Sequence, residues 1–422
     1  MSFLSKIRKD KRGNVLAIAA AALPLVIGSA GLASDTIQWA LWKRQLQRAA
    51  DSAAIAGVYD RITNDGATTN ATVAVDNDLT QNNHTIVELV ATYPQVDFPA
   101  DTAAYKIPVR VKLAVQKRLG FSSLFLSTAP TIHATAIAAT IKKGTYCVVS
   151  LENTDATGIT ATGNAAINLG CGMITNSSSL DAAIATGSST VTASPIAAYG
   201  DIPPSDHWGT AELLPFTVRQ DDPFASVSVP TFTGCQGAVN KLQVNASQTV
   251  SVPAAASHCY SSMKLDGNVT LGNGVYYVDG GNFSIGSGAS VTCMACTFVM
   301  TSSTPGTPVT IGTVGINGNA TVNLHAPTSG DFPNILFYQD RRAPTGASNK
   351  NILNGTATSV FEGAFYFPNQ ELQIGGTASM TFTCAQFVAR TVTFDGNGGV
   401  TNTCTGGYGT KSIWGRHVRL VG

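Results

Sequence analysis

Residues 266–293 read DGNVTLGNGVYYVDGGNFSIGSGASVTC, and this stretch decides the fold expected for most of the chain. Short runs with apolar side chains at alternate positions are separated by Gly and Asn. β-Branched and aromatic residues favour strands, whereas Gly and Asn favour the left-handed or bridge conformations of tight corners. The stretch therefore predicts several short strands that turn sharply into one another and share one apolar face.

Related phrases recur through the C-terminal region, as TGNAAINLGC (162–171), NGNATVNLHAP (317–327) and NGTATSVFEGAFYFP (354–368). The unit Gly-Asn-x-x-apolar-x-apolar returns irregularly at roughly 20–30 residues, which is the repeat range of solenoids. We therefore expect residues 146–422 to form a right-handed parallel β-helix-like solenoid, with a β-sandwich as the alternative. The Pro-rich stretch 195–230 is expected to be a linker or a loop that packs across the solenoid.

The N-terminal region has a different pattern. The run VLAIAAAALPLVIGSAGLA (15–33) carries no charge, and this length is about what a helix needs to cross a bilayer core. Residues 1–12 hold five basic residues against Asp10, so the positive-inside rule keeps them in the cytoplasm. We expect residues 13–59 to form a transmembrane helix that continues as an amphipathic stalk. The alternative is a cleaved signal peptide, but the helical pattern continues to about Tyr59 and favours an anchor.

Three residues of this helix are candidates for contacts with neighbouring helices. Gly28 and Gly31 are small enough to let another helix approach, although their spacing is not GxxxG. Asp35 has two interpretations: it pairs with a cationic group of a neighbouring helix during assembly, or it is an ordinary interfacial acid. The second is favoured because a charge at the end of a span reaches water at little cost.

The stretch RGNVLAIAAAALPLVIGSAGLASDTIQWALWKRQLQRAADSAAIAG (12–57) resembles the N-terminus of TadE/TadG-like proteins of the tight-adherence (Flp) pilus system. The matching features are Arg12-Gly13-Asn14, an Ala-rich span with a central Pro, Asp35, and the closing residues 47–54. The resemblance implies an inner-membrane anchor that works in pilus assembly with other Tad/Flp components. Processed pilins of this kind carry Glu five residues after the cleaved Gly; here that residue is Ile18, so a permanently tethered protein is expected.

Residues 60–145 are expected to form a small α+β module, with a helix at 71–79 and strands at 107–115 and 131–141. The strand stretch IPVRVKLAV alternates apolar and polar side chains, as a half-buried strand does. The module contains no cluster of residues that indicates catalysis.

All eight cysteines follow the proposed span, and an even number in an exported region predicts disulfides formed in an oxidising periplasm. Cysteines that are neighbours in the sequence are expected to pair: Cys147–Cys171, Cys235–Cys259, Cys293–Cys296 and Cys384–Cys404. The CxxC spacing of Cys293 and Cys296 also suits a redox pair or half a metal site. A structural disulfide is favoured, because the stretch lacks a thioredoxin-like context and a second CxxC.

Charged residues are 12% of the chain and the net charge is +1, so no basic field indicates nucleic acid. β-Helices can host polysaccharide lyases and hydrolases, and the candidate groups would be Asp279, Glu362 and the charged run Asp340-Arg341-Arg342. The run could contact an anionic surface polysaccharide, but a loop salt bridge is the more common explanation of such a run. Tyr276, Tyr277, Tyr338 and Tyr366 could stack on sugar rings, although their alternating neighbours favour the core. We expect no catalytic residues, no metal and no cofactor, and a role in pilus assembly or surface adhesion; a tethered polysaccharide-binding or polysaccharide-degrading β-helix is the alternative.

Overall fold

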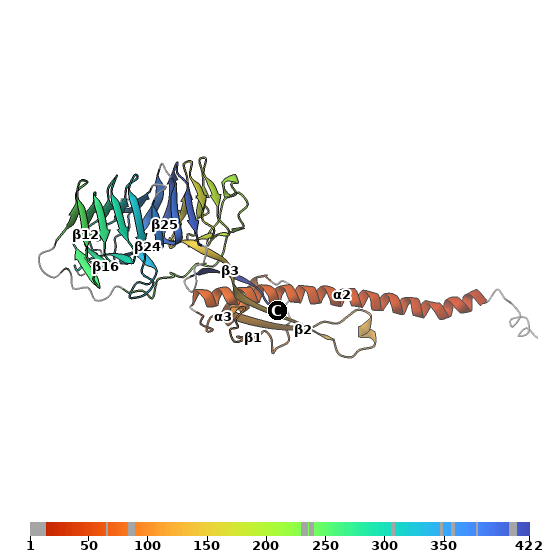
Figure 1. Cartoon of the computed structure of the whole chain (residues 1–422). Coiled ribbons are helices and arrows are strands. Elements are labelled where there is room, and N and C mark those ends of the chain that lie inside the picture. The colour runs from red at the N-terminus through yellow and green to blue at the C-terminus, as the bar shows by residue number, and fades with distance from the viewer. Residues whose placement is uncertain are drawn as a thin grey trace, which may run out of the picture. The chain divides into compact units, whose positions relative to one another are not determined.

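The structure is a computed structural model that describes residues 14–64, 66–82, 89–228, 235, 240–304, 309–346, 349–355, 359–376, 379–404 and 412–422 (Figure 1). The basic segment 1–12 lies outside the described residues. The chain divides into two compact units, Met1–Ile141 with Val418–Gly422, and Lys142–His417. The expected boundary therefore needs a correction at its end, because residues 418–422 belong to the first unit. There, Ile137 N donates to Gly422 O at 2.7 Å and Val421 N donates to Ile137 O at 2.8 Å.

A single long helix, α2 (Asn14–Thr63), continues through Pro24 and dominates the first unit. It is long and apolar enough to cross a membrane by length and composition. Its N-terminal half exposes large apolar side chains to its surroundings: Ile18, Leu23, Leu25, Val26, Ile27 and Leu32. Its C-terminal half is amphipathic, as expected, and buries one stripe of side chains: Leu46, Ala50, Ala53, Ala54 and Val58.

The buried stripe of α2 packs on a small α+β module. The module comprises α3 (Ala71–Asn82), β1 (Gln95–Asp97), β2 (Lys106–Gln116), the 3₁₀ turn η2 (Ser122–Leu124) and the first half of β3 (Thr131–Ser150). β2 pairs antiparallel with β1 and with β3, with Val111 opposite Ala136. Alternate residues of β2 face α2, and Val109, Val111 and Leu113 are fully buried.

The second unit is a solenoid of three parallel sheets, here named faces 1, 2 and 3. Face 1 comprises β13 (Ser257–Tyr260), β16 (Gly274–Asp279), β19 (Cys296–Thr301), β22 (Ile335–Gln339), the middle parts of β24 (Val360–Gly376) and β25 (Met380–Gly396), the end of β3, β6 (Gly172–Thr175), β9 (Ile196–Ala198) and β10 (Leu213–Leu214). Face 2 comprises β11 (Leu242–Val244), β14 (Met263–Leu265), β17 (Phe283–Ile285), β20 (Val314–Ile316), β23 (Lys350–Asn354), the ends of β24 and β25, β4 (Ile159–Ala161) and β7 (Ala183–Ala185). Face 3 comprises β12 (Thr249–Val252), β15 (Asn268–Leu271), β18 (Ser290–Cys293), β21 (Thr321–His325), the starts of β24 and β25, β26 (Val400–Thr403), β5 (Ala166–Asn168) and β8 (Thr190–Thr192).

Parallel pairing joins the strands of all three faces, so the expected parallel solenoid is confirmed and the β-sandwich is excluded. The interior holds a stack of aromatic rings from successive coils. Phe298 lies 5.1 Å from Phe337, and Phe337 lies 5.5 Å from Phe365, measured between ring centroids. Such stacking stabilises the solenoid because each coil buries its apolar side chains only against its neighbours.

The order of the coils in space differs from their order in the sequence. The chain enters at β3 and adds coils up to β10, and the next described strand in the sequence, β11, starts a second run of coils. The later coils end at β25 and β26, which pair with β3, β4 and β5. A seam, formed by β3–β5 on one side and β25–β26 on the other, therefore joins two runs of coils.

Residues 215–228 form a strap that packs on the outer side of face 1. Phe224 is buried there with Tyr338 and Tyr366, and its ring lies 5.5 Å from that of Tyr366. This segment of the Pro-rich stretch is thus a packed loop rather than a linker. The strap explains why the central strands of face 1, such as β19 and β22, are buried on both sides.

Candidate functional site

The carboxylate of Asp35 is buried against the connection between β2 and β3, which runs beside α2 (Figure 1). Its Oδ1 accepts a hydrogen bond from Phe121 N at 3.0 Å, and its Oδ2 accepts from both Ser122 N and Ser122 Oγ. These backbone donors lie at the start of η2, where N–H groups lack partners within the turn. Asp35 therefore fastens a loop of its own chain to the helix.

This geometry differs from both sequence-based interpretations of Asp35. The side chain is only 4% exposed, so it is not an acid that reaches freely into water. Its carboxylate accepts hydrogen bonds from Phe121 and Ser122 of the same chain, and pairing with a neighbouring helix stays a prediction. The donors lie more than 80 residues along the chain, and no local sequence pattern could have indicated them.

Gly28 and Gly31 differ in their surroundings, although the sequence suggested the same role for both. A Cβ atom added to Gly31 would overlap the ring of Phe121, whereas a Cβ atom added to Gly28 would have no atom within 4 Å. At Gly31 the close neighbour is Phe121 of the same chain, and the approach of another helix to either glycine stays a prediction. Gly28 lies on the open side of the helix.

The sequence suggested no functional role for the loop that follows Phe121, although its apolar run 120–126 predicts a short helix or turn. Leu124, Phe125 and Leu126 are 74%, 75% and 53% exposed, although each is strongly apolar. The sequence feature that could have indicated an exposed apolar loop is the uncharged run LGFSSLFLSTAP (119–130). It follows the basic residues Lys117 and Arg118. An exposed apolar cluster of this kind marks an interaction surface.

The charged run Asp340-Arg341-Arg342 forms its ion pair and hydrogen bonds within the solenoid. Arg342 Nη2 lies 2.8 Å from Asp340 Oδ2 and also donates to Ser302 O at 2.8 Å, while Thr301 Oγ1 donates to Asp340 at 2.9 Å. Burial opposes the charged carboxylate, but the hydrogen bonds from Arg342 and Thr301 outweigh it and hold the pKa of Asp340 below its usual value. The loop salt bridge considered in the sequence analysis is therefore present.

Arg341 points to the strap and not to an open surface. Its guanidinium donates to Val227 O at 2.9 Å and lies 5.2 Å from the ring centroid of Tyr366. The Tyr366 hydroxyl donates to Asp222 at 2.7 Å, and burial with this acidic partner raises the pKa of Tyr366. The run thus holds the strap on face 1, and its expected role as a ligand contact has no support in this geometry.

The other groups considered for sugar chemistry also have local partners. Asp279 accepts from Ser303 N at 2.7 Å and from Ser303 Oγ at 2.8 Å, and Glu362 lies 2.7 Å from His325 Nδ1. The tyrosines Tyr276, Tyr338 and Tyr366 are buried, which corrects their alternative role as sugar-stacking groups. Across the described ranges, no three His, Cys, Asp or Glu side chains gather as a metal site would require.

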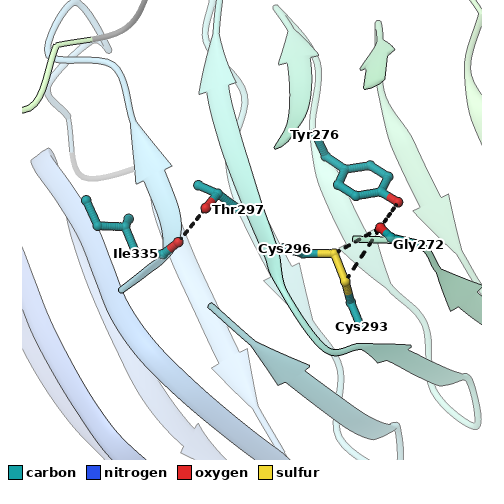
Figure 2. The surroundings of a disulfide bond; sticks show 6 residues. All are labelled: Gly272, Tyr276, Cys293, Cys296, Thr297 and Ile335. Atoms are coloured by element: carbon teal, nitrogen blue, oxygen red, sulfur yellow. Dashed lines mark hydrogen bonds between the residues drawn. A yellow bond between two sulfur atoms is a disulfide. The ribbon is translucent and has the colours of Figure 1, made fainter. Parts of the chain in front are cut away.

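All eight cysteines pair in the structure, and the pairs are the four local ones that the sequence suggested. The Cα–Cα distances are 5.8 Å for Cys147–Cys171, 5.3 Å for Cys235–Cys259, 6.0 Å for Cys293–Cys296 and 4.4 Å for Cys384–Cys404. Figure 2 shows the CxxC pair beside the carbonyl of Gly272, which accepts a hydrogen bond from the Tyr276 hydroxyl at 2.6 Å. Cys293 and Cys296 are buried, so this pair lacks the access that thiol–disulfide exchange needs.

The two units together define a class of protein: a single long helix, apolar over its first half, with a small α+β module, followed in the chain by a disulfide-bonded solenoid. Residues 13–60 match a family model described as "Putative Flp pilus-assembly TadE/G-like". The chain thus carries a TadE/G-like segment that covers the apolar half of α2 and most of its buried stripe. Neither the comparison with curated proteins nor the comparison with solved structures finds a match.

Proposed function

We propose that the chain is a non-catalytic envelope protein of the Flp/Tad pilus system, held in the bacterial inner membrane by α2 with its N-terminus in the cytoplasm. In this proposal the solenoid lies in the periplasm or at the cell surface and acts in pilus assembly or adhesion. The observation that carries the proposal is the match of residues 13–60 to the TadE/G-like family, since it coincides with the helix that can cross a membrane.

Two features support the proposed orientation. The five basic residues of segment 1–12 precede the apolar run, and such residues favour the cytoplasmic side. The cysteines all follow the span and are all paired, which suits an oxidising compartment beyond the membrane.

The contacts of the charged groups support a structural role for the solenoid. Asp340, Arg341 and Arg342 hold a corner and the strap, and Glu152 at the end of β3 lies 2.8 Å from Arg390 Nε. Most glycoside hydrolases use two carboxyl groups placed on either side of the bond that is cleaved. The proposed role instead uses the solenoid as a rigid body that presents its surface to a pilus component or to a polysaccharide.

Gene deletion and complementation in the host test the proposal. We expect deletion to abolish piliation or surface attachment, and the wild-type chain to restore it and to fractionate with the inner membrane. A Leu25→Arg variant should fail to restore either property, because a charge in the middle of an apolar span opposes membrane insertion. Leu25→Ala is the matched control and should behave as the wild type.

Two results would contradict the proposal. Normal piliation and attachment in the deletion strain would remove the link to the pilus system. Turnover of a bacterial polysaccharide by the purified full chain, lost when Asp279 or Glu362 is replaced by its amide, would favour the tethered polysaccharide-degrading alternative.

A further inference from the structure

The loop after Phe121 is an ordered turn with an apolar tip. Phe125 N and Leu126 N both donate to Ser122 O, at 3.0 Å and 2.8 Å, and the rings of Phe121 and Phe125 lie 5.3 Å apart. The N–H groups of residues 123–126 are all paired within this segment, so the tip can enter an apolar environment without leaving these donors unpaired. Phe121 turns toward α2, while Leu124, Phe125 and Leu126 face outward with half or more of their surface exposed.

The position of this loop along α2 is fixed by its contacts with Gly31 and Asp35. From Val15 to Asp35 the helix advances about 30 Å at 1.5 Å per residue, which equals the thickness of a bilayer hydrocarbon core. Asp35 is also the only charged residue between Asn14 and Lys43 in the sequence. The loop therefore lies at the level where α2 leaves the hydrocarbon core.

The side chains around this level suit lipid. Trp39 is 42% exposed on α2, and tryptophan favours the boundary between hydrocarbon and headgroups. Lys117 and Arg118 precede the uncharged run 119–130, and Lys117 Nζ lies 5.8 Å from the ring centroid of Trp42. Basic residues beside an apolar tip attract anionic headgroups, whereas the tip itself gains by leaving water.

We propose that the tip Leu124–Phe125–Leu126 inserts into the lipid interface of the bilayer that α2 crosses, on the side where α2 leaves it. The first unit then contacts the membrane through both α2 and the tip. These two contacts fix the rotation of α2 about its axis and the direction in which the chain leaves the membrane surface. Asp35 and Gly31 act as positioning residues that hold the loop at this depth. The proposal rests on the membrane anchoring proposed above and adds a second membrane contact to it.

Labelled cysteines in the full chain test this insertion. Because the eight native cysteines are paired, a cysteine introduced by Phe125→Cys is the only free thiol and takes an environment-sensitive fluorophore. The protein is reconstituted in phosphatidylethanolamine–phosphatidylglycerol vesicles with lipids that carry a spin label near the headgroup. We expect a blue-shifted emission and strong quenching at position 125.

Two further positions separate this proposal from the anchoring itself. A label at Leu25→Cys reports on the span, and a label at Val73→Cys, exposed on α3, reports on water. If position 125 behaves like position 73 while position 25 is in lipid, the loop proposal is overturned and the anchor stands. If position 25 is also in water, the anchoring fails. Shielding at position 125 that requires added Tad/Flp membrane components, and not lipid alone, identifies a protein-docking loop and overturns the lipid proposal.

The two glycines of α2 provide a matched pair of variants. Gly31→Ala places a methyl group against the Phe121 ring and should displace the loop, so quenching at position 125 should fall. Gly28→Ala adds the same atom where space is open and should leave the quenching unchanged. Equal quenching in both variants would show that α2 does not set the depth of the loop.

Discussion

The apolar half of α2 exposes its apolar side chains, whereas the solenoid buries its own. From Ile18 to Leu32 the helix leaves its large apolar side chains exposed, whereas the solenoid buries a continuous column of Phe, Val, Ile and Leu. A helix satisfies its own backbone hydrogen bonds and can offer apolar side chains to lipid. A strand satisfies its backbone only through neighbouring strands, so each coil of the solenoid needs the coils beside it.

The same apolar residue types therefore serve in two different surroundings within one chain. In the solenoid, apolar side chains contribute to the folded state through contacts with the protein. In the apolar half of α2 they have few protein contacts, and their contribution depends on the membrane. Substitutions should therefore separate the two regions by the size of their effect on unfolding.

The largest effect is expected at Phe337, which is fully buried between Phe283, Phe298, Phe365 and Phe367. Phe337→Ala should lower the free energy of unfolding of the second unit by about 3–5 kcal/mol, because it removes buried area and leaves a cavity. Denaturant unfolding of the detergent-solubilised full chain measures this. Leu25→Ala, the control in α2, should change it by less than about 0.5 kcal/mol. Similar effects of the two substitutions would contradict the comparison.

The disulfides should contribute to the free energy of unfolding of the second unit only. A disulfide that closes a long loop should contribute more than one that closes a short loop. Replacing Cys147 and Cys171 by Ala opens a closure across a sequence separation of 24 and should cost about 3 kcal/mol in the entropy model. The same replacement at Cys293 and Cys296, separated by 3, should cost about 2 kcal/mol, since the closed loop is short. All four positions are buried, so the packing losses are similar. A larger cost for the short pair would contradict this order.

A smaller loss of stability is expected where Asp35 of α2 binds the loop at Phe121 and Ser122. Asp35→Asn replaces a charged acceptor of three hydrogen bonds and should weaken the loop attachment by about 1.5–3 kcal/mol. Hydrogen exchange of the Phe121 and Ser122 amides should accelerate, while α3 stays protected. Asp51→Asn, which alters a side-chain contact with Gln47, is the control and should leave these two amides unchanged.

The smallest effect concerns His258 in β13, whose ring stacks on that of Tyr276 with 4.4 Å between centroids. Burial lowers the pKa of His258 below its usual value of 6.5, although a hydrogen bond to the backbone of Pro253 opposes the shift. The unfolded chain therefore binds a proton more readily than the folded one, so stability should fall as the pH drops below 6.5. His258→Phe should reduce this loss between pH 7 and pH 5; an unchanged pH profile in thermal unfolding would contradict the assignment.

Much of the fold could be predicted because its signals are local. The Gly-Asn corners and alternating apolar residues of 266–293 appear as β15 to β18, and the stretch 107–115 appears within β2. The uncharged run 15–33 likewise lies within α2. The seam could not be predicted, because every coil carries the same pattern and nothing in it says that residues 159–161 neighbour 392–394.

The candidate site was less predictable for a related reason. The acid at position 35 was visible, but its donors at positions 121 and 122 come from a distant hairpin. The charged run 340–342 was visible as well, but the strap that occupies Arg341 belongs to a stretch whose role the sequence left open. Residue type indicated where a polar contact would form, and the partner depended on the tertiary fold.

The seam has a consequence for the order in which the parts of the chain are made and folded. The coils formed by residues 146–198 emerge first, yet one edge of their β3, β4 and β5 finds its partners only in residues 387–401. Until the last coils arrive, that edge presents unpaired N–H and C=O groups, which are a template for strands of other chains. The sheets of the solenoid are therefore complete only when the last coils are present, and the open edge needs protection while about 200 further residues are made.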